Sequence, residues 1–233
     1  MSLPKPYYEN ELGRLYHADC LDILPHLEPV MSIVTDPPYG VTDNTWDKVV
    51  PALDWMKAGC CITTATEPFA TELIVSAPLP FRFDCVWVKN CCSNTMNSKR
   101  MPIRRHERVL IFGKYSWNSK KIERSVTEMK RLNKVQRQTM QFKNQDTVLE
   151  FDSVNCRAIE RTKHPSQKPI KLIIYLVDTF TIGTVLDPFL GSGTTAVACE
   201  RLKRRWIGIE IEEKYCAIAV KRIEAERKQL KLF

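Results

Sequence analysis

Short apolar runs bounded by turn signals recur along the chain, and such runs predict buried strands. They cover residues 14–20 (a strand and its turn), 31–34, 60–63, 81–89, 185–187 and 206–210. Between them, apolar residues spaced by three or four positions predict helices over 21–25, 46–57, 68–75, 172–180 and 192–201, and a last helix from residues 212–213 onwards. This alternation predicts an α/β fold with a doubly wound, mostly parallel sheet.

The region from Tyr115 to Phe151 departs from this alternation and is rich in basic residues. Apolar residues spaced by three or four positions predict one amphipathic helix within it. They are Ile122, Val126, Met129, Leu132 and Val135. Lysine, arginine, glutamine and asparagine are side chains that read purines in the major groove, so the region is a candidate DNA contact. The alternative is a solvated basic face.

A chain of 233 residues, 44% of them hydrophobic, is long enough for one sizeable α/β domain. No apolar run approaches the roughly 20 residues of a membrane span, and residues 1–6 lack the apolar core of a signal peptide. The nine cysteines form no C-x-x-C pair, which indicates neither a disulfide framework nor a zinc site and favours a reducing cytoplasm. The formal net charge of +8 favours a polyanionic partner.

Asp36-Pro37-Pro38-Tyr39 follows the predicted strand 31–34 directly. The two prolines end the strand, because each fixes φ and neither donates to a sheet ladder. In open α/β sheets, ligands bind at this carboxyl end of the strands. A carboxylate and an aromatic ring on a stiff loop suit a flat base with an exocyclic amine. The alternative is a strand end with a turn and a core tyrosine.

A glycine-containing motif follows the predicted strand 185–187. Gly191 and Gly193 let the backbone approach a ligand closely, and the amides of the next helix offer a place for an anion. No third glycine follows three residues later, which argues against a standard dinucleotide fingerprint. Glu210 ends the next predicted strand, 23 residues after Asp187, where an acidic group suits two ribose hydroxyls.

Three segments, at 36–39, 164–169 (H-P-S-Q-K-P) and 185–195 (V-L-D-P-F-L-G-S-G-T-T), resemble motifs of the β-class DNA amino-methyltransferases, in the same order along the chain. The resemblance implies a Rossmann-like methyltransferase sheet with a small inserted target-recognition region. It divides the chain into a catalytic half (1–114), the insert (115–160) and a cofactor-binding half (161–233).

The resemblance implies S-adenosylmethionine as cofactor, with S-adenosylhomocysteine as product, and no metal. It assigns catalysis to Asp36, Pro37, Pro38 and Tyr39. It assigns cofactor binding to Asp19, Cys20, Lys168, Asp187, Phe189, Gly191, Ser192, Gly193, Thr194, Thr195 and Glu210. For Asp19 alone, the residue pattern also suits a helix N-cap. His164 is interpreted as structural.

The candidate nucleic-acid contacts are basic residues beside the predicted catalytic loop or within the insert. They are Lys89, Arg100, Arg104, Arg105, Lys120, Lys121 and Arg124. Lys89 also suits a solvated strand end, and His106 and Glu107 are interpreted as structural.

The resemblance predicts methyl transfer to N6 of adenine in double-stranded DNA by base flipping, because members whose tetrapeptide starts with Asp mostly act on adenine. The alternatives are N4 of cytosine, RNA methylation and a catalytically silent DNA-binding module. A homodimer and a cognate restriction endonuclease are expected partners, in the cytoplasm of a prokaryote or as a phage-encoded protein.

Overall fold

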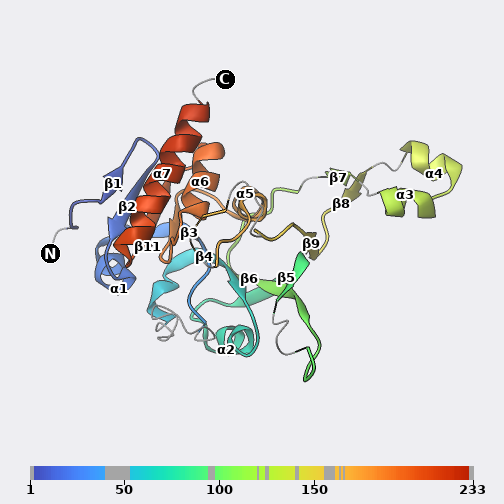
Figure 1. The fold of residues 1–233 in the computed structure, drawn as a ribbon, viewed down its shortest axis with the longest axis horizontal. Coiled ribbons are helices and arrows are strands. Elements are labelled where there is room, and N and C mark those ends of the chain that lie inside the picture. The colour runs from blue at the N-terminus through green and yellow to red at the C-terminus, as the bar shows by residue number, and fades with distance from the viewer. Residues whose placement is uncertain are drawn as a thin grey trace.

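The computed structural model describes residues 3–39, 53–93, 98–119, 121–123, 126–139, 142–154, 161–162, 164 and 166–230. Within these ranges nine strands form one sheet, in the order β1-β2-β11-β10-β3-β4-β6-β5-β9 (Figure 1). Their bounds are Tyr8–Glu9 (β1), Gly13–His17 (β2), Val30–Thr35 (β3), Ala58–Ala65 (β4), Phe81–Ser93 (β5), Arg104–Gly113 (β6), Val148–Glu150 (β9), Val185–Asp187 (β10) and Trp206–Glu210 (β11). Neighbours from β2 to β4 are parallel, while β1 and β6 run antiparallel to theirs, which confirms the predicted sheet.

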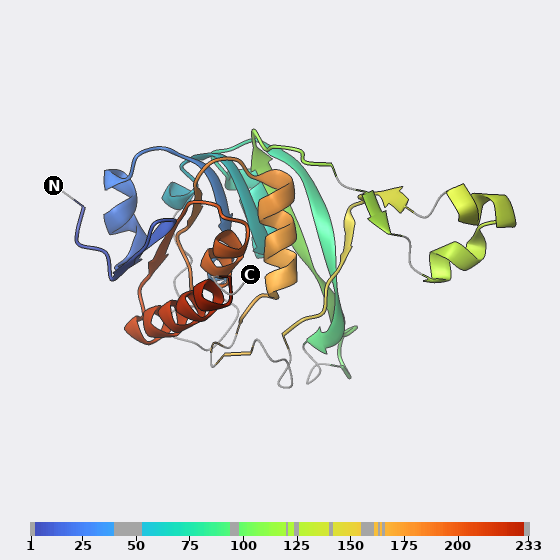
Figure 2. The ribbon, with the colours of Figure 1, turned by 90° about the horizontal axis from the view of Figure 1, so that it is seen from above.

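Helices cover both faces of the sheet. On one face α5 (Ile170–Phe180), α6 (Thr194–Arg201) and α7 (Glu213–Leu230) lie side by side (Figure 2). On the other face lie α1 (Cys20–Ile23), α2 (Phe69–Ser76) and the 3-10 turns Leu24–His26 and Leu53–Trp55. Successive strand residues point to opposite faces, so Ile33 packs in the α2 layer and Val34 in the α5 layer. Most of the helix predicted over 46–57 lies outside the described residues.

The order of the strands places a topological switch point between β3 and β10. From β3 the chain continues to β4 on one side, and from β10 it continues to β11 on the other. Because these strands are parallel, their carboxyl ends meet at one edge of the sheet. Ligands of open α/β sheets bind in the crevice beyond such a switch point. Asp36 follows β3 at this edge, and Asp187 ends β10 there.

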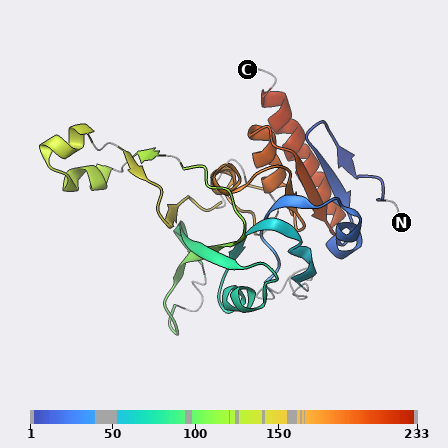
Figure 3. The same ribbon diagram turned by 180° about the vertical axis from the view of Figure 1, so that it is seen from behind.

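Residues 121–144 form an arm that projects from the rest of the molecule (Figures 1 and 3). It contains β7 (Lys121–Glu123), α3 (Val126–Arg131), α4 (Lys134–Thr139) and β8 (Phe142–Asn144), with β7 and β8 antiparallel. The predicted single amphipathic helix is therefore wrong.

The break between α3 and α4 has a local cause. The Asn133 side chain accepts from the Gln136 amide at 2.8 Å, and the Gln136 side chain accepts from the Asn133 amide at 3.1 Å. This reciprocal pair is a capping box, which starts a new helix. Arg137 donates to the carbonyls of Met129, Lys130 and Leu132 and so closes the end of α3.

The predicted insert is not wholly separate from the sheet. Its β9 pairs in parallel with β5, so the chain leaves the sheet between β6 and β9. The three-part division of the chain stays a prediction. No helix within the described ranges combines the length and the apolar character that crossing a bilayer requires.

Candidate active site

Asp36 lies directly after β3, and three side chains donate to its carboxylate. The hydroxyls of Tyr39 and Thr64 donate to Oδ1, and the Lys168 ammonium donates to Oδ2 at 2.5 Å. Thr64 comes from β4, the next strand of the sheet, and the sequence analysis missed it. An ionised carboxylate offers about four acceptor positions, so Asp36 can accept one further N–H.

Tyr39 rests on Phe69 of α2, with ring centroids 5.2 Å apart and planes inclined by 38°. Burial, followed by the negative charges of Asp36 and Glu107, raises the pKa of Tyr39 well above 10. The phenol is therefore protonated at neutral pH and acts as a hydrogen-bond donor to Asp36. Its predicted stacking on a target base stays a prediction.

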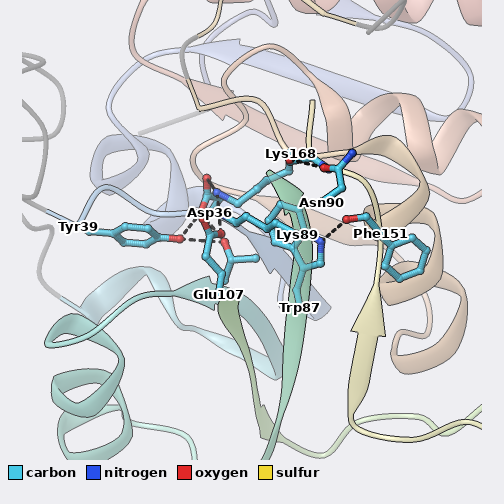
Figure 4. A network of polar contacts seen from close by, with 10 residues as sticks. Asp36, Tyr39, Trp87, Lys89, Asn90, Glu107, Phe151 and Lys168 are labelled. Carbon is cyan, nitrogen blue, oxygen red and sulfur yellow. Dashed lines mark hydrogen bonds and ion pairs between the residues drawn. The ribbon is translucent and has the colours of Figure 1, made fainter. Parts of the chain in front are cut away.

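Four charged side chains form a chain of ion pairs beside this loop (Figure 4). Lys168 lies between Asp36 and Glu107, with Nζ 3.5 Å from Glu107 Oε2, and Lys89 donates to Glu107 Oε1. We call Asp36, Lys168, Glu107 and Lys89 the charge chain. Its side chains are only 23%, 11%, 12% and 12% exposed, respectively. Two carboxylates and two ammonium groups balance, as buried charges require.

The charges in this chain stabilise one another. Burial alone would raise the pKa of Glu107, but the ammonium groups of Lys168 and Lys89 hold that pKa below its ordinary value. Burial alone would lower the pKa of Lys168, but Asp36 and Glu107 raise it above its ordinary value. Glu107 and Lys168 are therefore both charged at neutral pH.

The charge chain changes the interpretation of two lysines. Lys89 is not a solvated strand-end residue, because Glu107 holds its ammonium in a mostly buried position. Lys168 contacts the catalytic loop. The predicted contacts of Lys89 with nucleic acid and of Lys168 with a cofactor stay predictions.

Asp187 ends β10 on the other side of the switch point. Its Oδ1 accepts from the Thr35 hydroxyl at 2.6 Å and from the Phe189 amide at 3.1 Å, and Thr195 also donates to the carboxylate. Burial raises the pKa of Asp187 to about 6. An ammonium group beside this carboxylate would favour its ionised form.

Glu210 ends β11 and is 8% exposed. Its Oε2 accepts from the Gly191 amide at 2.7 Å, and its Oε1 accepts from the Glu212 amide at 2.8 Å. Burial raises the pKa of Glu210 above its ordinary value. Each oxygen keeps a second acceptor position, so the carboxylate can take two neighbouring hydroxyls.

The glycine motif forms a tight loop between these two acids. Gly191 and Gly193 have φ of +54° and +84°, a region that favours glycine. A Cβ at Gly193 would lie 2.9 Å from Cα of Ala219 in α7, so the loop packs directly on that helix. The helix α6 begins at Thr194, two residues later than predicted.

Arg222 of α7 reaches into the same loop. It donates to the Ser192 carbonyl at 2.7 Å and to the hydroxyls of Ser192 and Thr194 at 3.1 Å each. No local motif marks Arg222 as a partner of this loop, and the sequence analysis missed that contact. Whether these hydroxyls also contact a cofactor stays a prediction.

Asp19 is exposed and acts as the N-cap of α1, accepting from the Leu21 amide at 2.9 Å. Cys20 is buried, and burial raises the pKa of its thiol to about 12. The Ala18 amide donates to the Glu210 carbonyl at 3.1 Å, which brings this turn beside the end of β11. The cap is the role that the structure describes, and the predicted cofactor contact stays a prediction.

Two further ring contacts lie on the Asp187 side of the edge. The Phe189 ring packs against buried Trp55, with centroids 5.5 Å apart. His164 contacts Tyr215, with centroids 4.4 Å apart, and burial lowers the pKa of His164 to about 4. His164 is therefore neutral at pH 7, which agrees with its structural interpretation.

The candidate DNA-contacting residues lie in two places. Arg104 and Arg105 begin β6 at the edge that carries the charge chain, and Arg100 is exposed on the connection that leads there. Lys121 is exposed on β7 of the arm. Lys120 and Arg124 lie outside the described residues.

On one side of the switch point, Asp187 can accept from an ammonium group, Glu210 can accept from two hydroxyls, and the Phe189 ring forms a wall. On the other side, Asp36 can accept from an exocyclic amine. This set of hydrogen-bonding groups fits a nucleoside with an amino-acid side arm on one side and a nucleobase on the other.

Comparisons with known proteins show which class of protein has this fold. The fold is that of a Rossmann-like methyltransferase. A solved structure, "crystal structure of M1.HpyAVI-SAM complex", matches with a TM-score of 0.65 and 27% identity, covering 91% of this chain and 99% of that chain.

The family model described as DNA methylase matches residues 76–221, and the chain therefore belongs to this family. Type II methyltransferase M2.LlaDCHI of Lactococcus lactis subsp. cremoris is 29% identical over 95% of this chain and 93% of the relative. Type II methyltransferase M2.DpnII of Streptococcus pneumoniae is 54% identical over 66 residues. That shorter match spans 28% of this chain and only 25% of the relative.

Proposed function

We propose that the protein transfers a methyl group from S-adenosylmethionine to N6 of adenine in duplex DNA. The observation that carries this proposal is the Asp36 carboxylate, which lies at the switch point with an acceptor position left and with Asp187 across from it. Family membership supports methyl transfer to DNA. The choice of adenine rests on Asp36 as the first residue of the tetrapeptide.

The chain's residues have to turn a weak nucleophile into a reactive one. The lone pair of an exocyclic amine is delocalised into the base. Asp36 and the Pro37 carbonyl each accept one amine hydrogen, which favours a pyramidal nitrogen with a free lone pair. Tyr39 supports the ring of a base that has been flipped out of the duplex. Positioning and electrostatics therefore supply most of the catalysis.

S-adenosylmethionine, when bound, would supply an electrophilic methyl group from its sulfonium and leave as S-adenosylhomocysteine, and the methylated nitrogen would release one proton to Asp36 or to water. Asp187 would accept hydrogen bonds from its ammonium group, Glu210 would accept from its ribose hydroxyls, and Phe189 would border its flat or apolar parts. The amides at the start of α6 suit its carboxylate. The buried, polar surroundings of Asp187 and Glu210 hold these acceptors in place before the ligand arrives.

Double-stranded DNA is the proposed macromolecular substrate. The exposed basic residues at the start of β6 and in the arm would contact its phosphates, which position a duplex without reading its sequence. The homodimer and the cognate endonuclease stay predictions.

The test is methyl transfer from labelled S-adenosylmethionine to unmethylated genomic duplex DNA, followed by nucleoside analysis. Label in N6-methyladenine is the expected result. Label in N4-methylcytosine would contradict the choice of base and keep the reaction class. Label on RNA alone, or on neither nucleic acid while the cofactor binds, would overturn the proposed DNA substrate.

A further inference from the structure

Glu107 presents a buried oxygen that lacks a hydrogen bond of ordinary geometry. Its Oε1 accepts from Lys89, but its Oε2 is inaccessible to water and has the Lys168 ammonium only at ion-pair distance. Lys168 Nζ lies 3.5 Å from this Oε2 and 2.5 Å from Asp36 Oδ2. A buried acceptor without a hydrogen bond of ordinary geometry is costly, so a function for it is worth seeking.

The proposed reaction creates a conflict at Asp36. The carboxylate has an acceptor position left for the amine of the target base, so that amine would lie beside the Lys168 ammonium that donates to the same group. The amine nitrogen also gains positive charge as the methyl group arrives, and an ammonium close by repels that charge. Catalysis would therefore gain from a Lys168 that moves away from Asp36.

The distances show where Lys168 can move. A shift of roughly 0.5 Å would bring Nζ from 3.5 Å into ordinary hydrogen-bonding range of Glu107 Oε2. Glu107 is fixed on β6, opposite Trp87 of β5, and Lys89 holds its other oxygen. Lys168 lies on the segment just before α5 and has a long side chain. The move leaves the charge chain balanced, because no charge enters or leaves it.

We propose that Glu107 is a positioning residue that receives the Lys168 ammonium when the amine of the target base binds Asp36. The inference rests on the proposed function, because it concerns the same reaction. It gives a role to a residue that the sequence indicated only as structural. Lys89 contributes by holding Glu107 in place.

The test is the single-turnover rate of Glu107→Gln at saturating DNA and S-adenosylmethionine. We expect this rate to fall about 10- to 100-fold, because Lys168 then has no second carboxylate to receive it. The dissociation constant of S-adenosylmethionine should change little, whereas the thermal midpoint should fall, because the substitution leaves one mostly buried ammonium without its carboxylate. Glu28→Gln is the matched control, since Glu28 is exposed just before β3, at the opposite edge of the sheet.

A second comparison separates this role from a merely structural one. In a Lys168→Met background, Glu107→Gln should change the rate less than about threefold, because no ammonium remains to be repositioned. Equal losses with and without Lys168 would overturn the inference. If Glu107→Gln does not fold, Lys89→Gln/Glu107→Gln removes one charge of each sign and should show the same loss of rate.

The outcomes distinguish the two claims. If the wild-type protein transfers no methyl group to DNA, the proposed function fails and the inference fails with it. If the wild-type protein is active and Glu107→Gln keeps its full single-turnover rate, the inference alone is overturned.

Discussion

The carboxyl edge of the sheet and the arm both carry many charged side chains, but they hold them in opposite ways. At the edge, the four residues of the charge chain are mostly buried and pair with one another. In the arm, Lys130, Arg131 and Lys134 are exposed on two helices of six residues each. Lys89 and Glu107 lie on strands of the sheet, Asp36 follows β3 and Lys168 precedes α5. The described hydrogen bonds of α3 and α4, in contrast, are local.

This difference separates two tasks. Buried, fixed charges suit chemistry on a single amine, because they are preorganised and weakly screened. Exposed basic side chains suit phosphates, because they attract a polyanion and release its counterions. Changes at the edge should therefore alter the rate of the chemical step, and changes in the arm should alter how tightly DNA binds.

The largest effect should come from Asp36→Ala. Removing the acceptor of the amine hydrogen should lower turnover by about 10³-fold or more, while S-adenosylmethionine binds nearly as tightly as before. Initial rates with labelled cofactor, together with calorimetric binding of the cofactor, check both parts. Asp22→Asn, an exposed carboxylate on α1, serves as the control. Turnover at the wild-type level would refute the role of Asp36.

The next effect concerns the rigidity of the edge. Gly193→Ala should destabilise the fold by about 2–4 kcal/mol, because it places a side chain at positive φ and against the backbone of α7. Urea unfolding measures the change. Gly183→Ala is the matched control: it also has positive φ, but its Cβ meets only the flexible Met31 side chain, so it should lose about 1 kcal/mol. Equal losses in both variants would contradict the packing of this loop on α7.

The buried Asp187 should make both the stability of the fold and the affinity for S-adenosylmethionine depend on pH. Its pKa of about 6 lies above the ordinary 3.8, so the folded protein binds this proton more tightly than the unfolded chain does. The stability that this group contributes is therefore present at low pH and is lost as the pH rises from about 4 to about 6. Affinity for S-adenosylmethionine should show the opposite sign, because an ammonium group needs the ionised carboxylate.

We expect that affinity to fall about tenfold per pH unit below 6 and to level off above it. Calorimetric titrations from pH 5 to 8 measure it. Asp187→Asn should bind more weakly and lose this pH dependence. An unchanged slope in Asp187→Asn would assign the titration to another group, such as Glu210.

The smallest effect should come from the arm. Replacing Lys130, Arg131 and Lys134 by glutamine should weaken DNA binding and reduce the slope of log K against log salt concentration by about one for each lost phosphate contact. Fluorescence anisotropy at several salt concentrations measures this slope. A control variant with glutamine at Lys57, Lys221 and Lys228 removes the same charge from exposed positions on the body. Equal losses in the two variants would show that only net charge matters.

The sequence predicted those parts of the site that follow directly from strand ends. Asp36, Asp187 and Glu210 each end or follow a short apolar run, and parallel strands bring such ends to one edge. The partners of Asp36 and of the glycine loop were not predictable in this way. Lys168 is 132 residues from Asp36 along the chain, and Arg222 is 30 residues from Ser192. Such contacts depend on how elements pack, which apolar spacing does not encode.

In the arm, the apolar spacing led to a wrong prediction. The spacing predicted one helix, but among the apolar residues whose burial the structure describes, Met129 and Leu132 are only half-buried and Val135 is 71% exposed. Local hydrogen bonds from Asn133 and Gln136 therefore decide where one helix ends and the next begins. Apolar periodicity predicts a helix reliably only where the apolar face packs against a core.

The most direct measurement is the single-turnover rate of methyl transfer as a function of DNA concentration, for the wild type, Asp36→Ala and the arm variant. The arm variant should need more DNA but reach the wild-type maximal rate, whereas Asp36→Ala should stay near zero at every concentration. An arm variant that loses its maximal rate at saturating DNA, or an Asp36→Ala protein that keeps it, would contradict the division of tasks between the edge and the arm.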